Sequence, residues 1–340
     1  MTTSADDMIV KRAIDLPQGF ALVVTDLHGV WDAYARYRDM FLTLHAQNKA
    51  DVFILLGDVI HGYGPDQDDC SLDILLDIMQ LQNELGPERV IMLLGNHEMP
   101  HIYSIPLRKG NLVFTPRFEH ALGIHRAQVI DFLKGLPFLI RTPGGVMLTH
   151  AGASAEAALP QAAQRLLSFS HHALLNEAQR LIDEQDRAEL LRMYERGHGA
   201  EYSTLVQEYL AVTGPEDVRY DDLLRGFIVS QIDEFGELWS LLFSQCERGV
   251  GETVYGMQLA HFLDNFSTHN ERQRVLVTGH IGVRGGYAIV STHQLRLASW
   301  AHAHPPEAGC YLLFDIEYPV HTAVDLLPFV HPILQAASHH

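Results

Sequence analysis

The chain is poor in cysteine and in long apolar runs. Its 340 residues include only Cys70, Cys246 and Cys310, and no spacing among the three suggests a zinc knuckle or a disulfide framework. Residues 1–19 are polar and lack the basic start and apolar stretch of a signal peptide. No apolar run reaches the length that spans a bilayer. We therefore expect a cytoplasmic protein with reduced thiols and no membrane partner.

Positive charge is also scarce. The chain has 24 Lys and Arg residues against 42 Asp and Glu residues, which gives a formal net charge of −18. This excess of negative charge argues against stable binding to nucleic acid or to an anionic membrane, because both bind basic patches. It does not exclude a small anionic substrate, since a metal centre can supply positive charge locally.

The order of apolar segments indicates an α/β fold class. Hydrophobic residues make up 47% of the chain, which is typical of soluble globular proteins. Strands expected over residues 20–25, 52–56 and 89–94 alternate with helices expected over 32–49 and 71–85, and this alternation favours a largely parallel sheet. Further strands are expected at 145–149 and 274–278. Later β-rich segments suggest an antiparallel second layer packed on the first: 287–291, 294–300, 311–315 and 321–326.

We expect a single domain over residues 20–330, preceded by an N-terminal extension, 1–19. Between the strands at 145–149 and 274–278, residues 153–245 are rich in Leu, Ala, Glu, Gln and Arg, which favour helix. Glycine and proline divide this stretch into several pieces. We interpret it as a helical insertion lying over the site.

Polar residues follow the apolar runs at five places, and parallel strands put such residues at one edge of a sheet. Six candidate metal ligands stand there: Asp26, His28, Asp58, Asn96, His150 and His280. Their oxygen and nitrogen donors, without sulfur, suit Mn, Fe or Zn better than Mg or Ca. Six ligands are a natural number for two divalent ions that share a carboxylate. Such a pair holds phosphate oxygens and activates water, while a nearby imidazole protonates the leaving group.

Most of the 21 histidines have no such context. A single Asp-x-His or Gly-His pair is more often a loop or capping feature than a ligand, and it is the order and context of several motifs that indicate a site. Seven histidines are interpreted as incidental: His45, His120, His125, His171, His172, His198 and His269.

Taken together, the motifs resemble those of the calcineurin-like metallophosphoesterases. They are Asp26-Leu27-His28-Gly29, Gly57-Asp58, Gly95-Asn96-His97-Glu98, His150-Ala151-Gly152 and Gly279-His280. The complete Gly-Asn-His-Glu quartet, and Gly282 where a second histidine could follow His280, look most like the phosphoprotein phosphatase branch of bacterial type. The resemblance implies a four-layer β-sandwich of two mixed sheets flanked by helices.

The resemblance also implies a role for each matching residue. Asp26 and His28 would bind the first metal, and Asp58 would bridge the two ions, most readily Mn, with Fe or Zn as alternatives. The second metal would be held by Asn96, His150 and His280. His97 would be the general acid, Asn96 would also contact phosphate, and Arg248 would clamp phosphate oxygens.

One motif departs from the family pattern. In Gly57-Asp58-Val59-Ile60-His61-Gly62, His61 replaces an aspartate that orients the general acid, and Gly62 replaces a phosphate-binding arginine. His61 could still accept a hydrogen bond from His97, although it stabilises an imidazolium less than a carboxylate does. Arg117, Arg284 or an arginine of the insertion are candidates for the missing charge. The stretch 298–302 matches the family only loosely.

The motifs are compatible with three functions. The first is a dinuclear-metal phosphatase that hydrolyses phosphomonoesters, on phosphoprotein (Ser/Thr or Tyr) or on small molecules, by direct attack of a metal-bound hydroxide. The second is a nucleotide or dinucleoside-polyphosphate hydrolase, or phosphodiesterase, on the same centre. The third is a metal-binding scaffold whose activity has decayed at His61 and Gly62.

Overall fold

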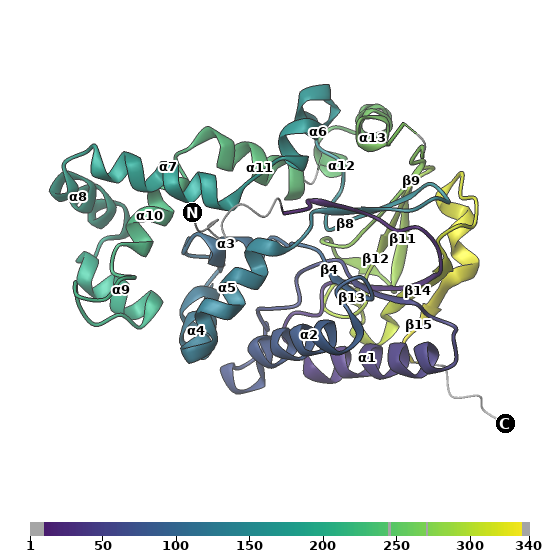
Figure 1. The fold of residues 1–340 in the computed structure, drawn as a ribbon, viewed down its shortest axis with the longest axis horizontal. Coiled ribbons are helices and arrows are strands. Elements are labelled where there is room, and N and C mark those ends of the chain that lie inside the picture. The colour runs from purple at the N-terminus through teal and green to yellow at the C-terminus, as the bar shows by residue number, and fades with distance from the viewer. Residues whose placement is uncertain (1–9, 244–245, 270, 335–340) are drawn as a thin grey trace, which may run out of the picture.

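The computed structural model describes residues 10–243, 246–269 and 271–334. Two β-sheets pack face to face, with helices outside both of them (Figure 1). The first sheet has the strand order β15-β14-β2-β3-β4 and the second has the order β1-β7-β8-β9-β12-β11. The chain is therefore a mixed α/β protein with two mixed sheets flanked by helices, as the resemblance implied.

The first sheet is built on three parallel strands, β2 (Phe20–Val24), β3 (Val52–Leu55) and β4 (Val90–Met92). These strands and their connecting helices, α1 (Trp31–Ala46) and α2 (Ser71–Leu85), lie where the sequence predicts them. On the other side of β2, β14 (Cys310–Asp315) runs antiparallel and carries β15 (Val330–Pro332) at the edge.

The second sheet is mixed, so the expectation of an antiparallel second layer was wrong. Its centre is parallel: β8 (Val146–Thr149), β9 (Val275–Thr278) and β12 (Gln294–Leu297). Antiparallel strands flank it, β7 (Leu139–Arg141) beside β8 and β11 (Tyr287–Ser291) beside β12. The physical reason is connectivity, because the long helical segment between β8 and β9 returns the chain to the same end of the sheet.

Side chains alternate between two apolar layers, as a strand period of two requires. Ala21 and Val23 of β2 pack between the sheets together with Val277 of β9. Leu22 and Val24 point the other way and pack with the residues of α1 and α2. The strand ends are thus held rigidly by apolar contacts on both faces, which is what a precise site at the sheet edge needs.

Residues just before 20 also belong to the sheet. Ala13–Asp15 form β1, which pairs parallel with β7, although the sequence assigned them to an N-terminal extension. Arg141 explains the docking, since its Nε lies 2.6 Å from Oδ1 of Asp15. Arg12 is buried and donates from Nη1 to the carbonyl oxygen of Leu136 at 2.9 Å.

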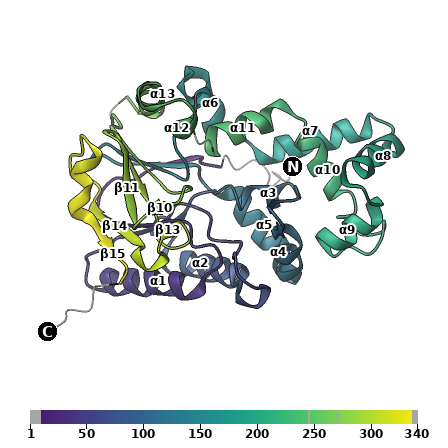
Figure 2. The same ribbon diagram turned by 180° about the vertical axis from the view of Figure 1, so that it is seen from behind.

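Helices fill the segment between β8 and β9, and they continue past the expected end near residue 245. They are η4 (Glu156–Ala158), α6 (Pro160–Leu167), α7 (His171–Asp183), α8 (Arg187–His198), α9 (Tyr202–Leu210), α10 (Asp222–Val229), α11 (Asp233–Phe243), α12 (Cys246–Gly249) and α13 (Glu252–Phe266). Figures 1 and 2 show α8 and α9 at the end of the molecule away from the sheets. The division of the chain into one domain with an insertion stays a prediction.

The remaining elements lie around the strand ends. They are η2 (Asp66–Asp68), α3 (Met99–Ile102), β5 (Arg108–Lys109), β6 (Leu112–Val113), α4 (Phe114–Leu122), η3 (Gly123–His125), α5 (Arg126–Gly135), β10 (Val283–Arg284), β13 (Ala303–His304), η5 (Pro306–Ala308) and η6 (Ala323–Phe329). The β-rich character expected over 321–326 was wrong there, because Thr322 and Asp325 form a capping box that starts the 3₁₀ helix η6. Among the described helices, none is long and apolar enough to cross a membrane.

Candidate metal centre

Both sheets deliver polar residues to one common edge. Asp26 and His28 follow β2, Asp58 follows β3, and Asn96 and His97 follow β4 in the first sheet. From the second sheet, His150 follows β8 and His280 follows β9. All six predicted ligands are brought together, and three groups of potential ligand atoms within 4.8 Å of one another result: Asp26, His28 and His302; His28, Asp58 and His97; Asp58, His150 and His280.

The backbone turns sharply at these residues. Asp26, His28, Asp58 and His280 have positive φ values of 53°, 45°, 53° and 69°. Non-glycine residues rarely adopt this conformation, which costs of order 1–3 kcal/mol each. Because the strands before them are buried on both faces, the fold holds the turns in place.

Hydrogen bonds fix which nitrogen faces the centre in two of the predicted ligand histidines. Nδ1 of His28 lies 3.1 Å from the carbonyl oxygen of Ile60, and Nδ1 of His150 lies 2.9 Å from that of Leu56. A carbonyl oxygen only accepts, so both Nδ1 atoms carry a proton and each Nε2 is the nitrogen left for a metal. This is the usual outer support of a metal-binding histidine.

The surroundings of His150 fit a bound cation. Its Nε2 lies 3.0 Å from Oδ1 of Asn96, 3.2 Å from Nδ1 of His280 and 3.4 Å from Oδ2 of Asp58. Electron-rich atoms therefore converge on one point. Burial disfavours the charged form of His150, yet the carboxylates of Asp58 and Asp26 outweigh it and raise the pKa of His150 to about 9. A bound divalent ion would compensate the same negative carboxylate charge that this proton compensates.

A further residue, His302, joins the first group. Its Nδ1 lies 3.0 Å from Oδ1 of Asp26. Within the described part of the chain neither atom makes a hydrogen bond of good geometry, although both are buried. Two such atoms side by side fit a shared cation. His302 was not among the predicted ligands, because its stretch, 298–302, matches the family only loosely and it follows β12 and the turn at Trp300 rather than an apolar run that ends in a motif.

Glu98 holds the loop that carries Asp58. Its buried carboxylate accepts from the backbone N–H groups of Asp58 at 3.0 Å, Val59 at 2.9 Å and Gly95 at 3.1 Å. The two loops approach so closely that a Cβ at Gly57 would lie 2.8 Å from Cα of Gly95. Gly57 also has a φ of +101°, so a larger residue would be both crowded and strained there. Asp58 is thereby fixed between the two sheets.

His97 and His61 are in contact, as the sequence suggested. Their Nδ1 atoms lie 2.9 Å apart, and both rings are buried. His97 also belongs to the group with His28 and Asp58, and its ring centroid lies 4.6 Å from that of His28. Burial lowers the pKa of His97 to about 3, with Asp58 opposing the shift, so the resting side chain is neutral.

The cations around the Gly62 position differ from those expected. Arg117 does not face the centre, because Nη1 donates to the carbonyl oxygen of Gly62 at 2.9 Å and the guanidinium pairs with Asp66. Lys109 of β5 lies closer to the ligands. Its Nζ donates to the hydroxyl of Tyr63 at 3.2 Å, and that hydroxyl lies 3.5 Å from Nε2 of His28.

The predicted phosphate contact of Arg248 concerns the short helix α12. Arg248 is in α12, but its side chain lies outside the described residues. Glu247 is described and forms an ion pair with Arg296. The phosphate-clamping role of Arg248 therefore stays a prediction.

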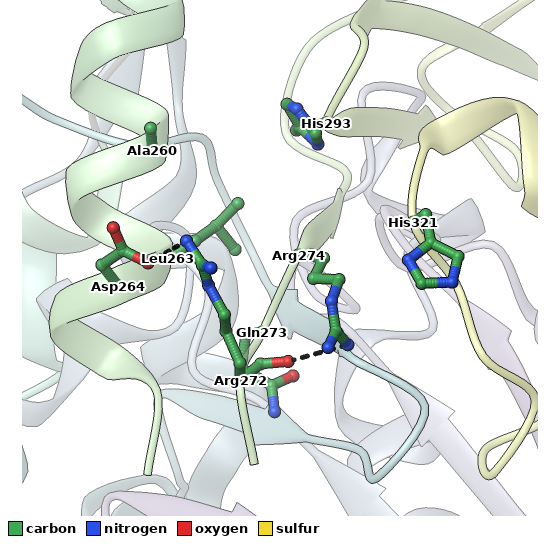
Figure 3. A pocket seen from close by; sticks show the side chains of 8 residues that line it. All are labelled: Ala260, Leu263, Asp264, Arg272, Gln273, Arg274, His293 and His321. Carbon is green, nitrogen blue, oxygen red and sulfur yellow. Dashed lines mark hydrogen bonds and ion pairs between the residues drawn. The ribbon is translucent and has the colours of Figure 1, made fainter. Parts of the chain in front are cut away.

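A separate cavity of about 250 Å³ lies at the other end of β9 (Figure 3). Arg272 and Arg274 precede that strand, whereas His280 follows it. In this cavity Arg272 pairs with Asp264 at 3.0 Å, and none of the metal-ligand candidates lines it. It is not the metal centre.

Comparison with known proteins agrees with this class of site. Residues 21–224, more than half of the chain, match the model of the calcineurin-like phosphoesterase family. The chain belongs to the calcineurin-like phosphoesterases, a family of metal-dependent phosphoesterases, and its buried His and Asp groups are consistent with a dinuclear metal site. A search of curated proteins gave no match.

Several solved structures are similar to the chain. A protein serine/threonine phosphatase from Saccharomyces cerevisiae is 13% identical, with a TM-score of 0.48, over 89% of this chain and 76% of that one. A cold-active protein-tyrosine phosphatase from a psychrophilic Shewanella is 16% identical, with a TM-score of 0.44, over 92% and 79%. A metallophosphoesterase from Sphaerobacter thermophilus is 12% identical, with a TM-score of 0.35, over 91% of each.

Proposed function

We propose that the protein is a dinuclear-metal phosphatase that hydrolyses phosphomonoesters, on phosphoprotein or on small molecules. The observation that carries this proposal is the shared position of Asp58. This carboxylate belongs to one group with His28 and His97 and to another with His150 and His280. A carboxylate between two sets of neutral donors is suited to hold two cations a few ångström apart.

Two divalent cations, when bound, would supply the positive charge that attracts phosphate oxygens and activates water. The donors are nitrogen and oxygen without sulfur, which suits Mn, Fe and Zn, and we propose Mn. Asp58 would be common to both ions. The remaining ligands would divide into two sets: Asp26, His28 and His302 for one ion, and Asn96, His150 and His280 for the other.

His97 would give a proton to the leaving group. Its Nδ1 faces His61, so Nε2 is the nitrogen left for the oxygen of the departing alcohol. The resting imidazole is neutral because it is buried. A dianionic phosphate bound beside it would add the negative charge that favours a protonated ring. The proton would then lie next to the bond that breaks.

Lys109 would take over part of the phosphate binding lost at Gly62. It reaches the centre through Tyr63, which touches His28. With Asn96 and Arg248, it would face the phosphate oxygens. A monoester carries two negative charges at neutral pH and a diester one, so cations placed here favour the monoester.

The test compares substrates on one preparation. The purified Mn²⁺-loaded protein is assayed with p-nitrophenyl phosphate, bis-p-nitrophenyl phosphate and a dinucleoside polyphosphate. We expect the highest kcat/KM with the monoester. Faster cleavage of the diester or of the dinucleotide would replace this proposal with the phosphodiesterase or nucleotide hydrolase. Metal binding without any turnover would support the third function, a metal-binding scaffold without activity. Phospho-Ser/Thr and phospho-Tyr peptides then separate the protein substrates.

A further inference from the structure

His61 connects the metal centre to a carboxylate that lies well behind it. Nδ1 of His61 is 2.9 Å from Nδ1 of His97, and Nε2 of His61 is 2.8 Å from Nε2 of His101. Nδ1 of His101 is in turn 2.9 Å from Oε1 of Glu119 in α4. Three imidazoles and one carboxylate thus form a continuous line, which we call the histidine relay: His97, His61, His101 and Glu119.

The relay is shut off from water. His61, His101 and Glu119 are 0%, 1% and 3% exposed. The ring of Phe114 stacks on His61 with centroids 4.7 Å apart, and the ring of Phe118 meets His101 edge to face at 4.6 Å. Both ring nitrogens of His61 therefore have imidazoles as their partners, and each contact must have one donor and one acceptor.

The far end of the relay is electrically balanced. Oε2 of Glu119 accepts from Nε of Arg126 at 2.8 Å. Burial alone would raise the pKa of Glu119, but the hydrogen bond and the charge interaction with His101, followed by the charge of Arg126, lower it, so the carboxylate is ionised. Arg126 also reaches Asp222, 3.4 Å away, and Nη1 of Arg225 lies 2.6 Å from that second carboxylate. The two carboxylates are thus matched by two guanidinium groups.

An ionised carboxylate accepts hydrogen bonds and donates none, and this fixes the direction of its contact with His101. Nδ1 of His101 must carry the proton that faces Glu119. With one proton on each imidazole, Nε2 of His101 is an acceptor. His61 then donates from Nε2, and its own Nδ1 is bare. His97 donates from Nδ1 and its Nε2 is left without a proton. With one proton on each imidazole, the three rings supply one N–H to each of the three contacts in this direction, whereas a doubly protonated His101 would reverse both contacts of His61.

We propose that Glu119 is a positioning residue for His97, acting through His101 and His61. It holds the Nδ1 proton of His97 on the side of His61 and so keeps Nε2 as the nitrogen that exchanges a proton with the substrate. The inference rests on the proposed function for its catalytic consequence, but the tautomer itself does not depend on activity. The relay supplies, at a distance, the carboxylate that is absent at residue 61.

The direct test is the tautomer of His97 in Glu119→Gln. The amide has a single oxygen, which Arg126 requires as an acceptor, so the amide nitrogen donates to Nδ1 of His101 and every proton of the relay changes sides. Histidine-selective ¹⁵N NMR of the full-length Zn²⁺-loaded protein reports which nitrogen is protonated. We expect Nδ1–H at His97 in the parent protein and Nε2–H in the variant. Asp222→Asn is the matched control, because it changes a carboxylate on the same arginine outside the relay, and it should leave the tautomer unchanged.

Kinetics provide the second readout. Glu119→Gln should lower kcat for an alkyl phosphate, whose alkoxide needs a proton, by about 10–100-fold, because His61 then donates to Nδ1 of His97 and opposes the protonated ring. This loss lies at or below the lower end of general acid–base contributions. The kcat for p-nitrophenyl phosphate should fall by less than about threefold, since that leaving group departs as the anion. In a His61→Asp background a carboxylate meets His97 directly, so adding Glu119→Gln should have no further effect on the leaving-group dependence.

The outcomes separate the two proposals. An unchanged His97 tautomer in a folded Glu119→Gln protein overturns the relay, and so do equal kinetic losses with both substrates. A parent protein that hydrolyses no phosphomonoester overturns the proposed function, whereas the NMR result still decides the relay.

Discussion

Nδ1 of His302 lies 3.0 Å from Oδ1 of Asp26, and both atoms lack a well-formed hydrogen bond in the described part of the chain. Asp26 comes at the end of β2, whereas His302 comes from the turn before β13. The contact adds a potential donor, His302, to the group of Asp26 and His28. This residue was not among the six predicted ligands.

Replacing His302 tests this assignment. We expect His302→Ala to weaken binding of one of two Mn²⁺ ions by at least about 10–100-fold, which is the range for losing even an outer partner of a ligand. Isothermal titration of the metal-free protein measures both sites. His293→Ala, an exposed histidine, should bind both ions like the parent. Unchanged affinity at both sites in His302→Ala would remove His302 from the ligand set.

Asp58 should affect both ions at once. Asp58→Asn replaces a shared anion by a neutral amide, so we expect the bound Mn²⁺ to fall from about two ions per chain to one or fewer, because the two cations then repel without compensation. Elemental analysis after gel filtration measures the content. Asp131→Asn, at an exposed position, is the control. Two retained ions would contradict a bridging role.

His97 should matter for poor leaving groups. His97→Asn removes the proton donor, so kcat should fall by about 100-fold or more for an alkyl phosphate and far less for p-nitrophenyl phosphate. Steady-state kinetics with the two substrates measure the ratio. The assignment as general acid fails when the losses are equal.

Lys109 should act on substrate binding. Lys109→Met keeps the aliphatic stem and removes the charge next to Tyr63, so we expect KM for a phosphomonoester to rise about tenfold, which corresponds to about 1.4 kcal/mol. Inhibition by inorganic phosphate should weaken in parallel. The exposed Lys49→Met provides the comparison. A fall in kcat with unchanged KM would point to another role.

His171 should make stability depend on pH. It is buried in α7, where desolvation first and Arg12 second hold its pKa well below 6.5, and its Nδ1 contacts the hydroxyl of Tyr103 at 2.5 Å. The folded protein thus keeps His171 neutral while the unfolded chain binds a proton. Its contribution is complete above about pH 6.5 and is lost as pH falls below that value, by up to about 1.4 kcal/mol per unit.

Urea unfolding of the metal-free protein at pH 7, 6 and 5 measures this loss. His171→Gln still accepts from Tyr103 but does not titrate, so its stability should fall less steeply with acid. His172→Gln, the exposed neighbour on the same helix, should follow the parent protein. Equal slopes of stability against pH in all three proteins would exclude His171 as a source of the pH dependence.

Local patterns in the sequence were enough for much of the fold. The apolar runs before Asp26, Asp58 and Asn96 predicted buried parallel strands, and the structure has β2, β3 and β4 there. The pattern failed where a cap or a crossover decides the outcome. Thr322 and Asp325 start a 3₁₀ helix in a segment that alternates like a strand, and the return of the chain at β9 makes the second sheet mixed.

For the candidate metal centre, the sequence alone predicted six ligands that the structure brings together, because each follows an apolar run and the ends of such runs meet at one sheet edge. Only the tertiary structure brought in His302, His101 and Glu119, since their partners come from distant turns and helices. It also decided where Arg117 and Lys109 point. A side chain's direction depends on packing and on which hydrogen-bonding groups of neighbouring segments lack partners. Neither can be predicted from the spacing of residues along the sequence.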